Sequence, residues 1–200
     1  MLVTQKAPNF TATTVLGNNE IVADFNLYEN FGEKGTVLFF YPLDFTFVCP
    51  SEIIAFDKRL DEFTSRGINV IGVSVDSQFS HFAWKSTAIN DGGIGQVRYP
   101  LVADLTKQIS KDYDVLLDGG VALRGSFLID ADGTVRHAVI NDLPLGRNID
   151  EMISNKIIFQ IILQNKGYFF LQKRRNFCKT VIIWHYGCKF IGFVIACKTK

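Results

Sequence analysis

The sequence is poor in cysteine, and its few cysteines are unevenly placed. Only four of the 200 residues are cysteine, and Cys49 is the single one before residue 178. No charged stretch followed by an apolar one opens the chain, so no secretion leader is predicted and the cytoplasm is the expected compartment. These features argue against a small disulfide-stapled scaffold, and the ordinary apolar content favours one domain that buries a real core.

Acidic residues are missing from the last quarter of the chain. Residues 1–152 contain all twenty Asp and Glu against twelve Lys and Arg, whereas residues 153–200 contain nine Lys and Arg and no acid. This abrupt change predicts a folded domain over 1–152 and a divergent, basic and apolar C-terminal tail over 153–200. The favoured hypothesis for the tail is a shifted or non-coding frame joined to the domain, and a natural extension is the alternative.

The chain is organised around the stretch 37–52, VLFFYPLDFTFVCPSE. Its first five residues are a continuous β-branched and aromatic run, typical of a strand buried on both faces, and Pro42 ends that run. Pro50 is typical of a first helical turn, and apolar residues follow it at helical spacing. Cys49 is therefore predicted at a helix N-terminus, where unpaired amides and the helix dipole favour the nucleophilic thiolate.

A lone cysteine is also often buried and inert, so its neighbours matter. The spacing Pro42-x-x-x-Thr46-x-x-Cys49, within FFYPLDFTFVCPSEI, resembles the active-site motif of the typical two-cysteine peroxiredoxins, the group that includes bacterial alkyl hydroperoxide reductase peroxidase subunits. The resemblance continues in six later segments: GVSVDS at 72–77, HFAWK at 81–85, GGIGQV at 92–97, YPLVAD at 99–104, ALRGSFLID at 122–130 and RHAVINDLPLGRNIDEM at 136–152.

The resemblance implies a thioredoxin-like α/β fold over residues 1–152, with a central mixed β-sheet flanked by helices. It implies that Cys49 is the peroxidatic cysteine and that Thr46 hydrogen-bonds the thiolate and the peroxide. It further implies that Pro42 shields the pocket and that Arg124 favours the thiolate and positions the peroxide. The residue types suit this chemistry, because a peroxide needs an ionised sulfur, a donor for the leaving oxygen and an oriented O–O bond. Without the resemblance, Thr46 also fits a turn residue and Arg124 a surface charge.

The implied function is that of an antioxidant oxidoreductase with a redox-active cysteine. The thiolate of such a peroxidase reduces hydrogen peroxide or an organic hydroperoxide and becomes a sulfenic acid. A resolving thiol then forms a disulfide, which thioredoxin or a dedicated flavoprotein reductase reduces. Relatives are homodimers that assemble into rings. The resemblance thus implies a hydroperoxide substrate, a redox-protein partner and a homodimer or ring of dimers, with no cofactor, metal, nucleic acid or membrane.

The resolving step has no obvious residue. The family takes its resolving cysteine from a Val-Cys-Pro segment, and this chain has none after residue 50. Cys178 lies nearest to the expected place, although its neighbours do not match, and Cys188 and Cys197 are further candidates. Recycling through one of these, recycling through an external thiol, and failure to recycle all stay open.

Two other functions fit parts of the sequence. The apolar tail suits a holdase chaperone, or an inactive relative without a resolving cysteine, and such a function would survive Cys49→Ser. A dithiol electron carrier is disfavoured, because the residues after Cys49 are Pro50, Ser51 and Glu52 and supply no second cysteine of a Cys-x-x-Cys pair.

Metal and membrane sites are not predicted. A zinc site can be drawn in the tail from Cys178, His185, Cys188 and Cys197, but its spacing is irregular. The apolar stretch 181–197 is interrupted by charge and is shorter than the roughly 20 residues of a membrane span. Asp130 and Asp132 are interpreted as a tight turn rather than a metal or acid–base pair.

Hydrophobic patterns predict the elements of the domain. Strands are expected at 7–15, 20–22, 37–41, 68–75, 99–103, 123–129 and 134–140. One helix is expected from Pro50 towards Gly67, a second over 77–89, and a third over 105–113 with Asp104 as its N-cap.

Overall fold

The computed structural model describes residues 1–153, 168–170 and 183–185. The chain divides into two units, Met1–Ile153 and Ser154–Lys200. In the second unit, β8 (Tyr168–Phe170) and β9 (Ile183–His185) pair antiparallel.

Several sequence predictions lie outside the described residues. These are the resolving and zinc-binding roles of the tail cysteines and the origin of the tail, which concern Cys178, Cys188, Cys197 and most of 153–200. Within the part of the chain that the structure describes, no helix has the length and apolar character needed to cross a bilayer.

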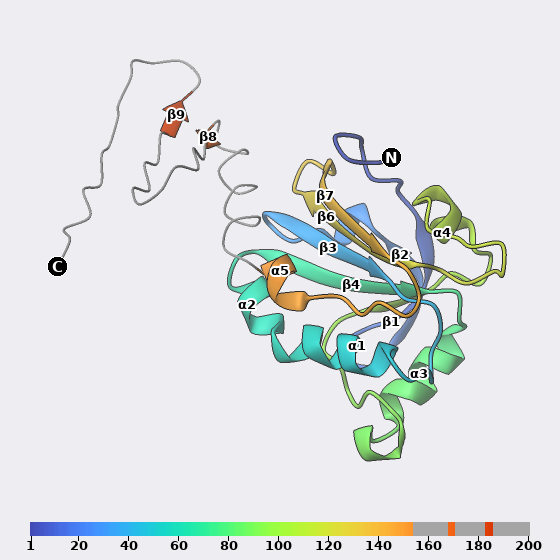
Figure 1. Ribbon diagram of the computed structural model, residues 1–200. Helices are drawn as coiled ribbons and strands as arrows, with labels where there is room; N and C mark the ends of the chain where they lie inside the picture. The colour runs from blue at the N-terminus through green and yellow to red at the C-terminus, as the bar shows by residue number, and fades with distance from the viewer. Residues whose placement is uncertain (154–167, 171–182, 186–200) are drawn as a thin grey trace. The chain divides into compact units, whose positions relative to one another are not determined.

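The first unit is built on a seven-stranded mixed sheet (Figure 1). Its strands are β1 (Thr11–Val15), β2 (Ile21–Asn26), β3 (Gly35–Phe40), β4 (Ile68–Ser74), β5 (Leu101–Ala103), β6 (Arg124–Asp130) and β7 (Val135–Asn141). They lie in the order β2-β1-β5-β4-β3-β6-β7. The pairs β3–β4 and β4–β5 are parallel, and all other neighbouring pairs are antiparallel. The mixed sheet confirms the predicted α/β class, and the two runs predicted to be buried strands, β3 and β4, lie inside it.

Helices cover both faces of this sheet (Figure 1). The α-helices are α1 (Cys49–Lys58), α2 (Leu60–Thr64), α3 (Gln78–Ser86), α4 (Gln108–Asp112) and α5 (Ile149–Ile153), with short 3-10 helices η1 (Tyr28–Asn30) and η2 (Ile89–Asp91). Helices α1, α2 and α3 lie on one face and α4 on the other, while α5 packs against α1. The result is a layered α/β/α arrangement, as the thioredoxin-like prediction requires.

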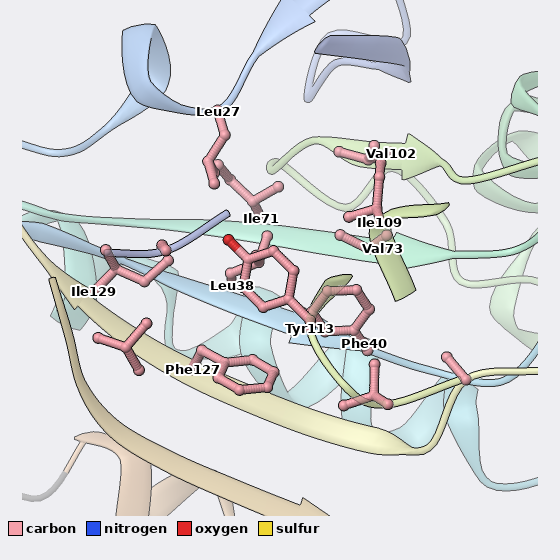
Figure 2. Packing of buried hydrophobic residues seen from close by; sticks show 14 of the residues in the cluster. Leu27, Leu38, Phe40, Ile71, Val73, Val102, Ile109, Tyr113, Phe127 and Ile129 are labelled. Carbon is pink, nitrogen blue, oxygen red and sulfur yellow. The ribbon is translucent and has the colours of Figure 1, made fainter. Parts of the chain in front are cut away.

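The alternation of side chains along β3 divides the core between the two faces. Leu38 and Phe40 join the cluster that contains Tyr113 at the end of α4 (Figure 2). Phe39 points to the opposite face and stacks on Phe56 of α1, with 4.4 Å between ring centroids. All of these β3 side chains are fully buried, and each contributes about 2–3 kcal/mol through the hydrophobic effect. This packing holds the end of β3, from which the chain leads to Cys49.

The single helix predicted from Pro50 towards Gly67 is wrong, because the structure has two helices separated at Arg59. The Nη2 of Arg98 donates to the backbone oxygen of Asp57 at 2.7 Å, beside this break. The guanidinium of Arg98 also pairs with the carboxylates of Asp57 and Asp61.

The third predicted helix is shorter than expected. It begins at Gln108 rather than at residue 105, because Lys107 adopts a left-handed backbone conformation with φ of 62°. Asp104 still caps it, since its carboxylate accepts the backbone N–H of Ile109 at 3.1 Å and of Ser110 at 2.7 Å.

The interpretation of Asp130 and Asp132 as a turn is confirmed. Oδ1 of Asp130 accepts the backbone N–H of Asp132 at 3.0 Å and of Thr134 at 2.8 Å, and Gly133 supplies the positive φ. Oδ2 of Asp130 pairs with Arg136. Within the described residues, no three His, Cys, Asp or Glu side chains are grouped to hold a metal ion.

Candidate functional site

The candidate site lies at the edge of the sheet where β3 ends. The parallel strands β3, β4 and β5 bring their carboxyl ends to this edge, which is the usual ligand-binding side of such sheets. Strand β6 runs antiparallel to β3, so its first residue, Arg124, lies at the same edge. The topology therefore joins Cys49 and Arg124, which are 75 residues apart in the sequence.

Cys49 is the first residue of α1 and is fully buried. The predicted helix N-terminus at this cysteine is confirmed, with Pro50 in the first turn. The N-cap residue, Val48, makes no side-chain capping bond. No capping side chain therefore competes with the Cys49 sulfur for the free amides of the first turn. These amides and the positive end of the helix dipole favour a negative charge on the sulfur.

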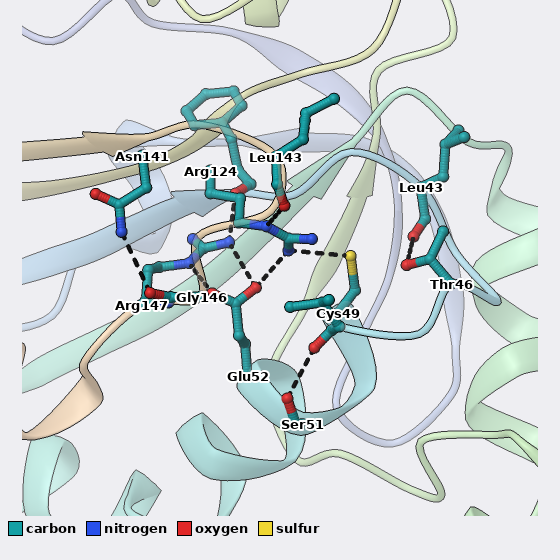
Figure 3. A network of polar contacts seen from close by, with 12 residues as sticks. Leu43, Thr46, Cys49, Ser51, Glu52, Arg124, Asn141, Leu143, Gly146 and Arg147 are labelled. Atoms are coloured by element: carbon teal, nitrogen blue, oxygen red, sulfur yellow. Dashed lines mark hydrogen bonds and ion pairs between the residues drawn. The ribbon is translucent and has the colours of Figure 1, made fainter.

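Arg124 is the cation beside this sulfur (Figure 3). Its Nη1 donates to Cys49 Sγ at 3.2 Å and to Glu52 Oε2 at 2.6 Å. Its Nε donates to the backbone oxygen of Leu143 at 2.7 Å, which fixes the plane of the guanidinium. Within the described residues Nη2 has no hydrogen-bond partner, so it is the donor left for a small ligand. The predicted pairing of Cys49 and Arg124 is thus present in space.

Glu52 and Arg147 complete the cluster, and neither was a predicted site residue. The backbone N–H and Nε of Arg147 donate to Glu52 Oε1 at 2.6 and 3.1 Å. Burial lowers the pKa of Arg147, and the charge of Glu52 opposes that shift. Glu52 lies three residues after Cys49 on the same helix face, a spacing that sequence alone can detect. Arg147 is 95 residues from Glu52 and has no local signal.

The remaining donors of Arg147 hold it in the sheet edge. Nη1 donates to the backbone oxygen of Gly125 at 3.0 Å and to Ser126 Oγ at 3.2 Å. Nη2 donates to the backbone oxygen of Phe40 at 2.6 Å, and the guanidinium carbon lies 5.0 Å from the ring centroid of Phe39. Because every donor is used, Arg147 has one well-defined position.

The other two predicted residues lie in the loop before α1. Pro42 is buried and lies two residues after the end of β3. Thr46 is half-buried, and its Oγ1 donates to the backbone oxygen of Leu43 at 3.1 Å. No hydrogen bond joins Thr46 to Cys49 among the described residues. The hydroxyl therefore keeps its lone pairs available to accept a hydrogen bond from a ligand.

A second buried cluster anchors this loop. Asp44 Oδ2 lies 2.8 Å from Nδ1 of His81, and His81 Nε2 lies 3.2 Å from the backbone oxygen of Val102. Both ring nitrogens of His81 thus lie within hydrogen-bonding distance of an oxygen atom. Burial and the charge of Asp44 raise the pKa of Tyr41, so its phenol stays protonated and donates to Asp44 Oδ1 at 2.9 Å.

The arrangement at Cys49 combines a nucleophile with fixed positive charge. A thiolate at a helix N-terminus attacks an electrophilic atom, and the Arg124 guanidinium stabilises negative charge on the group that leaves. The closed, buried setting favours a small substrate with a leaving oxygen.

The chain matches known proteins over most of its length. The model of the AhpC/TSA family matches residues 3–138. Alkyl hydroperoxide reductase C of Helicobacter pylori (strain ATCC 700392 / 26695) is 64% identical over 153 residues, which cover 76% of this chain and 77% of that protein. The mitochondrial thioredoxin-dependent peroxide reductase of Drosophila melanogaster is 51% identical over 164 residues, which cover 82% of this chain and 69% of that protein.

Solved structures show the same likeness. Reduced 2-Cys peroxiredoxin of Plasmodium vivax has a TM-score of 0.80 and 44% identity, covering 90% of this chain and 93% of that one. AhpC of Enterococcus faecalis has a TM-score of 0.74 and 30% identity, covering 83% of this chain and 96% of that one.

Proposed function

This chain belongs to the AhpC/TSA family, and from this premise we propose that it is a thiol peroxidase whose Cys49 reduces hydrogen peroxide and organic hydroperoxides. The observation that supports it best is the 3.2 Å hydrogen bond from Arg124 Nη1 to the buried Cys49 Sγ. The names of the relatives describe enzymes, so a holdase without enzymatic activity is not favoured.

The proposed reaction is a displacement at oxygen. The Cys49 thiolate attacks one peroxide oxygen, an S–O bond forms and the O–O bond breaks. The sulfur is oxidised to a sulfenic acid, and the peroxide is reduced by the same two electrons. The second oxygen leaves with its electron pair and takes a proton, so that water or an alcohol is released.

Each neighbouring residue has a proposed part in this step. Arg124 stabilises the negative charge that develops on the leaving oxygen, through donors that need no rearrangement. Thr46 accepts a hydrogen bond from the peroxide O–H and so orients the O–O bond towards Cys49. Pro42 closes the pocket against water, which would otherwise weaken these electrostatic interactions.

Trapping the sulfenic acid tests this proposal. The reduced protein is mixed with hydrogen peroxide and dimedone, and the labelled cysteine is identified by mass spectrometry at a series of times. We expect rapid labelling at Cys49 and none in Cys49→Ser. A folded protein whose Cys49 stays unlabelled would overturn the peroxidase proposal.

We also propose that the sulfenic acid is recycled by thioredoxin or a dedicated reductase, directly or through a resolving thiol. Residues 1–153 contain no second cysteine, so a resolving thiol must come from Cys178, Cys188, Cys197 or another molecule. Peroxide turnover coupled to a thioredoxin system, measured for each cysteine-to-serine variant, distinguishes these sources. Turnover that is unaffected by all three substitutions would point to an external thiol.

A homodimer is proposed because β7 is an edge strand. Its outer side has no partner strand among the described residues, and its Ile140 side chain is 46% exposed. Pairing the edges of two copies would satisfy the free backbone groups and bury this apolar surface. Sedimentation velocity is expected to show a dimer that Ile140→Asp weakens.

A ring of dimers is proposed from a second apolar surface. Large exposed side chains gather on the loop before α1 and on α3: Leu43, Phe45, Phe47, Phe79 and Phe82. Such a patch is a typical contact surface between proteins. We expect Phe79→Asp to dissociate assemblies larger than the dimer while leaving the dimer intact, as sedimentation velocity would reveal.

The domain boundary and the compartment are proposed on physical grounds. The last residue that contributes to the site is Arg147, so a catalytic domain over 1–152 holds every described site residue. Limited proteolysis should leave a stable fragment that ends near residue 153.

Sequencing of the transcript across codon 152 tests the hypothesis that the tail is translated from a shifted or non-coding frame. A reactive thiol supplied by reducing partners suits the cytoplasm, which a fluorescent fusion would test.

A further inference from the structure

We propose that a gap in the sheet beside Val70 of β4 binds a small, neutral and planar nitrogen heterocycle. The ligand presents a hydrogen-bond donor and an acceptor side by side, as one edge of a nucleobase does. The gap lies at the amino-terminal half of β4, whereas Cys49 follows the carboxyl end of β3. The proposal is therefore independent of the peroxidase function.

The ladder between β4 and β5 covers only the last three residues of β4. It begins with the pair Gly72 and Leu101, and the N–H of Gly72 donates to the backbone oxygen of Pro100 at 3.0 Å. Backbone groups alternate in direction along a strand, so those of Val70 point to the same side as those of Gly72. Val70 is thus placed to continue the ladder, but the pairing stops before it.

Two features of the segment before β5 end this ladder. In the next parallel step the N–H of residue 100 would donate to the backbone oxygen of Val70, but this residue is proline and has no N–H. The N–H of Val70 would in turn need the backbone oxygen of Arg98. That oxygen instead faces the turn between β1 and β2, since a Cβ added at Gly17 would collide with it.

Contacts with α1 hold Arg98 in this position. Its backbone N–H donates to Asp57 Oδ1 at 2.8 Å, and its Nη2 donates to the backbone oxygen of Asp57 at 2.7 Å. Within the described residues, neither the N–H nor the C=O of Val70 has a hydrogen-bond partner. Val70 is only 2% exposed, and buried backbone groups without a partner are rare and costly. A molecule that enters the gap can supply a partner to both groups.

The space beside Val70 is a pocket of about 180 Å³. Its walls come from both faces of the sheet, as a gap between strands requires. Phe25 and Ile71 belong to the core on the α4 side, and Leu60 comes from α2 on the other side. A cavity of about 150 Å³ in another protein accommodates benzene, so this pocket has room for one small ring system. Apolar walls with a few placed polar groups are typical of ligand pockets.

The charges at the pocket favour a neutral ligand. Among the residues that line it, Arg98 is the charged one, and its guanidinium already pairs with Asp57 and Asp61. An ionic ligand would therefore enter a largely apolar site without a counter-ion, which is unfavourable. The N–H and C=O of Val70 then select a ligand whose acceptor and donor are adjacent, because both groups belong to one residue.

Titration with 7-azaindole tests this proposal, because its ring N–H and its ring acceptor nitrogen lie side by side. The proton–nitrogen correlation NMR spectrum of the full-length protein reports the Val70 amide directly. We expect the Val70 resonance to move and to saturate at about millimolar ligand, as is usual for such a small molecule. A Val70 resonance that does not respond, or whose movement never saturates, would overturn the proposal.

Indole is the matched control ligand. It has the shape and the N–H of 7-azaindole but lacks the acceptor nitrogen, so it can bond the C=O of Val70 but not the N–H. We expect indole to bind about tenfold more weakly, the equivalent of one neutral hydrogen bond. Equal affinities would mean that apolar burial alone drives binding, and the recognition assigned to Val70 would be wrong.

The variant Pro100→Ala tests the cause of the gap. Alanine supplies the N–H that the ladder lacks, and this N–H can donate to the backbone oxygen of Val70 in competition with the ligand. The affinity for 7-azaindole should fall about tenfold, while Pro8→Ala, the same change outside the pocket, should leave it unchanged. An unaltered affinity in folded Pro100→Ala would contradict the proposal. If Pro100→Ala does not fold, the comparison of indole with 7-azaindole in the wild-type protein decides.

Discussion

Two buried polar clusters hold the segment between β3 and α1, and different side chains face the carboxylate in each. The thiol cluster places Arg124 and Arg147 around Glu52 and Cys49. The anchor cluster pairs Asp44 with His81. A guanidinium keeps its proton at any pH a protein survives, so the charge that Arg124 offers to the thiolate is permanent. The anchor cluster instead joins a phenol and an imidazole ring, those of Tyr41 and His81, to one carboxylate.

The largest effect is expected when the permanent charge is removed. Arg124→Ala deletes the donor to Cys49 Sγ and leaves Glu52 as the nearest charge of the wrong sign on the same helix. The rate of Cys49 oxidation by hydrogen peroxide should fall about 10²–10³-fold, measured by rapid mixing. Arg136→Ala is the matched control. A fall of less than about fivefold in Arg124→Ala would remove the thiol cluster from the mechanism.

The anchor cluster should matter more for stability than for chemistry. Asp44→Ala leaves His81 and Tyr41 without their shared acceptor, so the free energy of unfolding should fall by about 3 kcal/mol, measured with urea. This is the lower end of the range for breaking a buried pair. The exposed Asp118→Ala should change stability by less than about 0.5 kcal/mol. Equal effects of the two substitutions would show that Asp44 does not anchor the loop.

Thr46 lies on the loop between the two clusters, and substitutions at this position test the role of its hydroxyl. Thr46→Val keeps the shape but loses the hydroxyl that we assign to the peroxide, so the oxidation rate should fall about tenfold, the kinetic equivalent of one neutral hydrogen bond. Thr46→Ser keeps the hydroxyl and should retain most of the rate. If valine and serine behave alike, the hydroxyl does not orient the peroxide.

A smaller effect is expected at Lys85, a buried lysine on α3. Burial lowers its pKa from 10.5 to about 8. Between these values the native state has lost the proton and the unfolded state still holds it, so stability rises with pH. The gain from Lys85 should be about 1 kcal/mol between about pH 7 and pH 9, and it should be absent in Lys85→Met. Urea unfolding at each pH measures it, with the exposed Lys111→Met as the control. The same pH slope in wild type and Lys85→Met would contradict the assignment.

Local sequence patterns predicted an element correctly wherever the residues that cause it lie close together in the sequence. The buried strand β3 follows from its continuous apolar run, and the start of α1 at Cys49 follows from Pro50. The cap by Asp104 and the turn at Asp130 follow from side chains that bond the backbone nearby. The break at Arg59 was not predicted, because apolar residues continue at helical spacing across it, with Phe56 before it and Leu60 and Phe63 after it.

The site divides in the same way. The sequence by itself determined the candidates Cys49, Thr46, Pro42 and Arg124, through their types, spacing and family resemblance. Only the tertiary structure decided that Arg124 contacts the Cys49 sulfur, 75 residues away in the sequence, and that Arg147 pairs with Glu52, 95 residues away. The physical reason is that charge balance belongs to side chains that share a buried space. Which side chains share that space is set by tertiary contacts such as the antiparallel pairing of β6 with β3. The residues next to each charge in the sequence do not determine it.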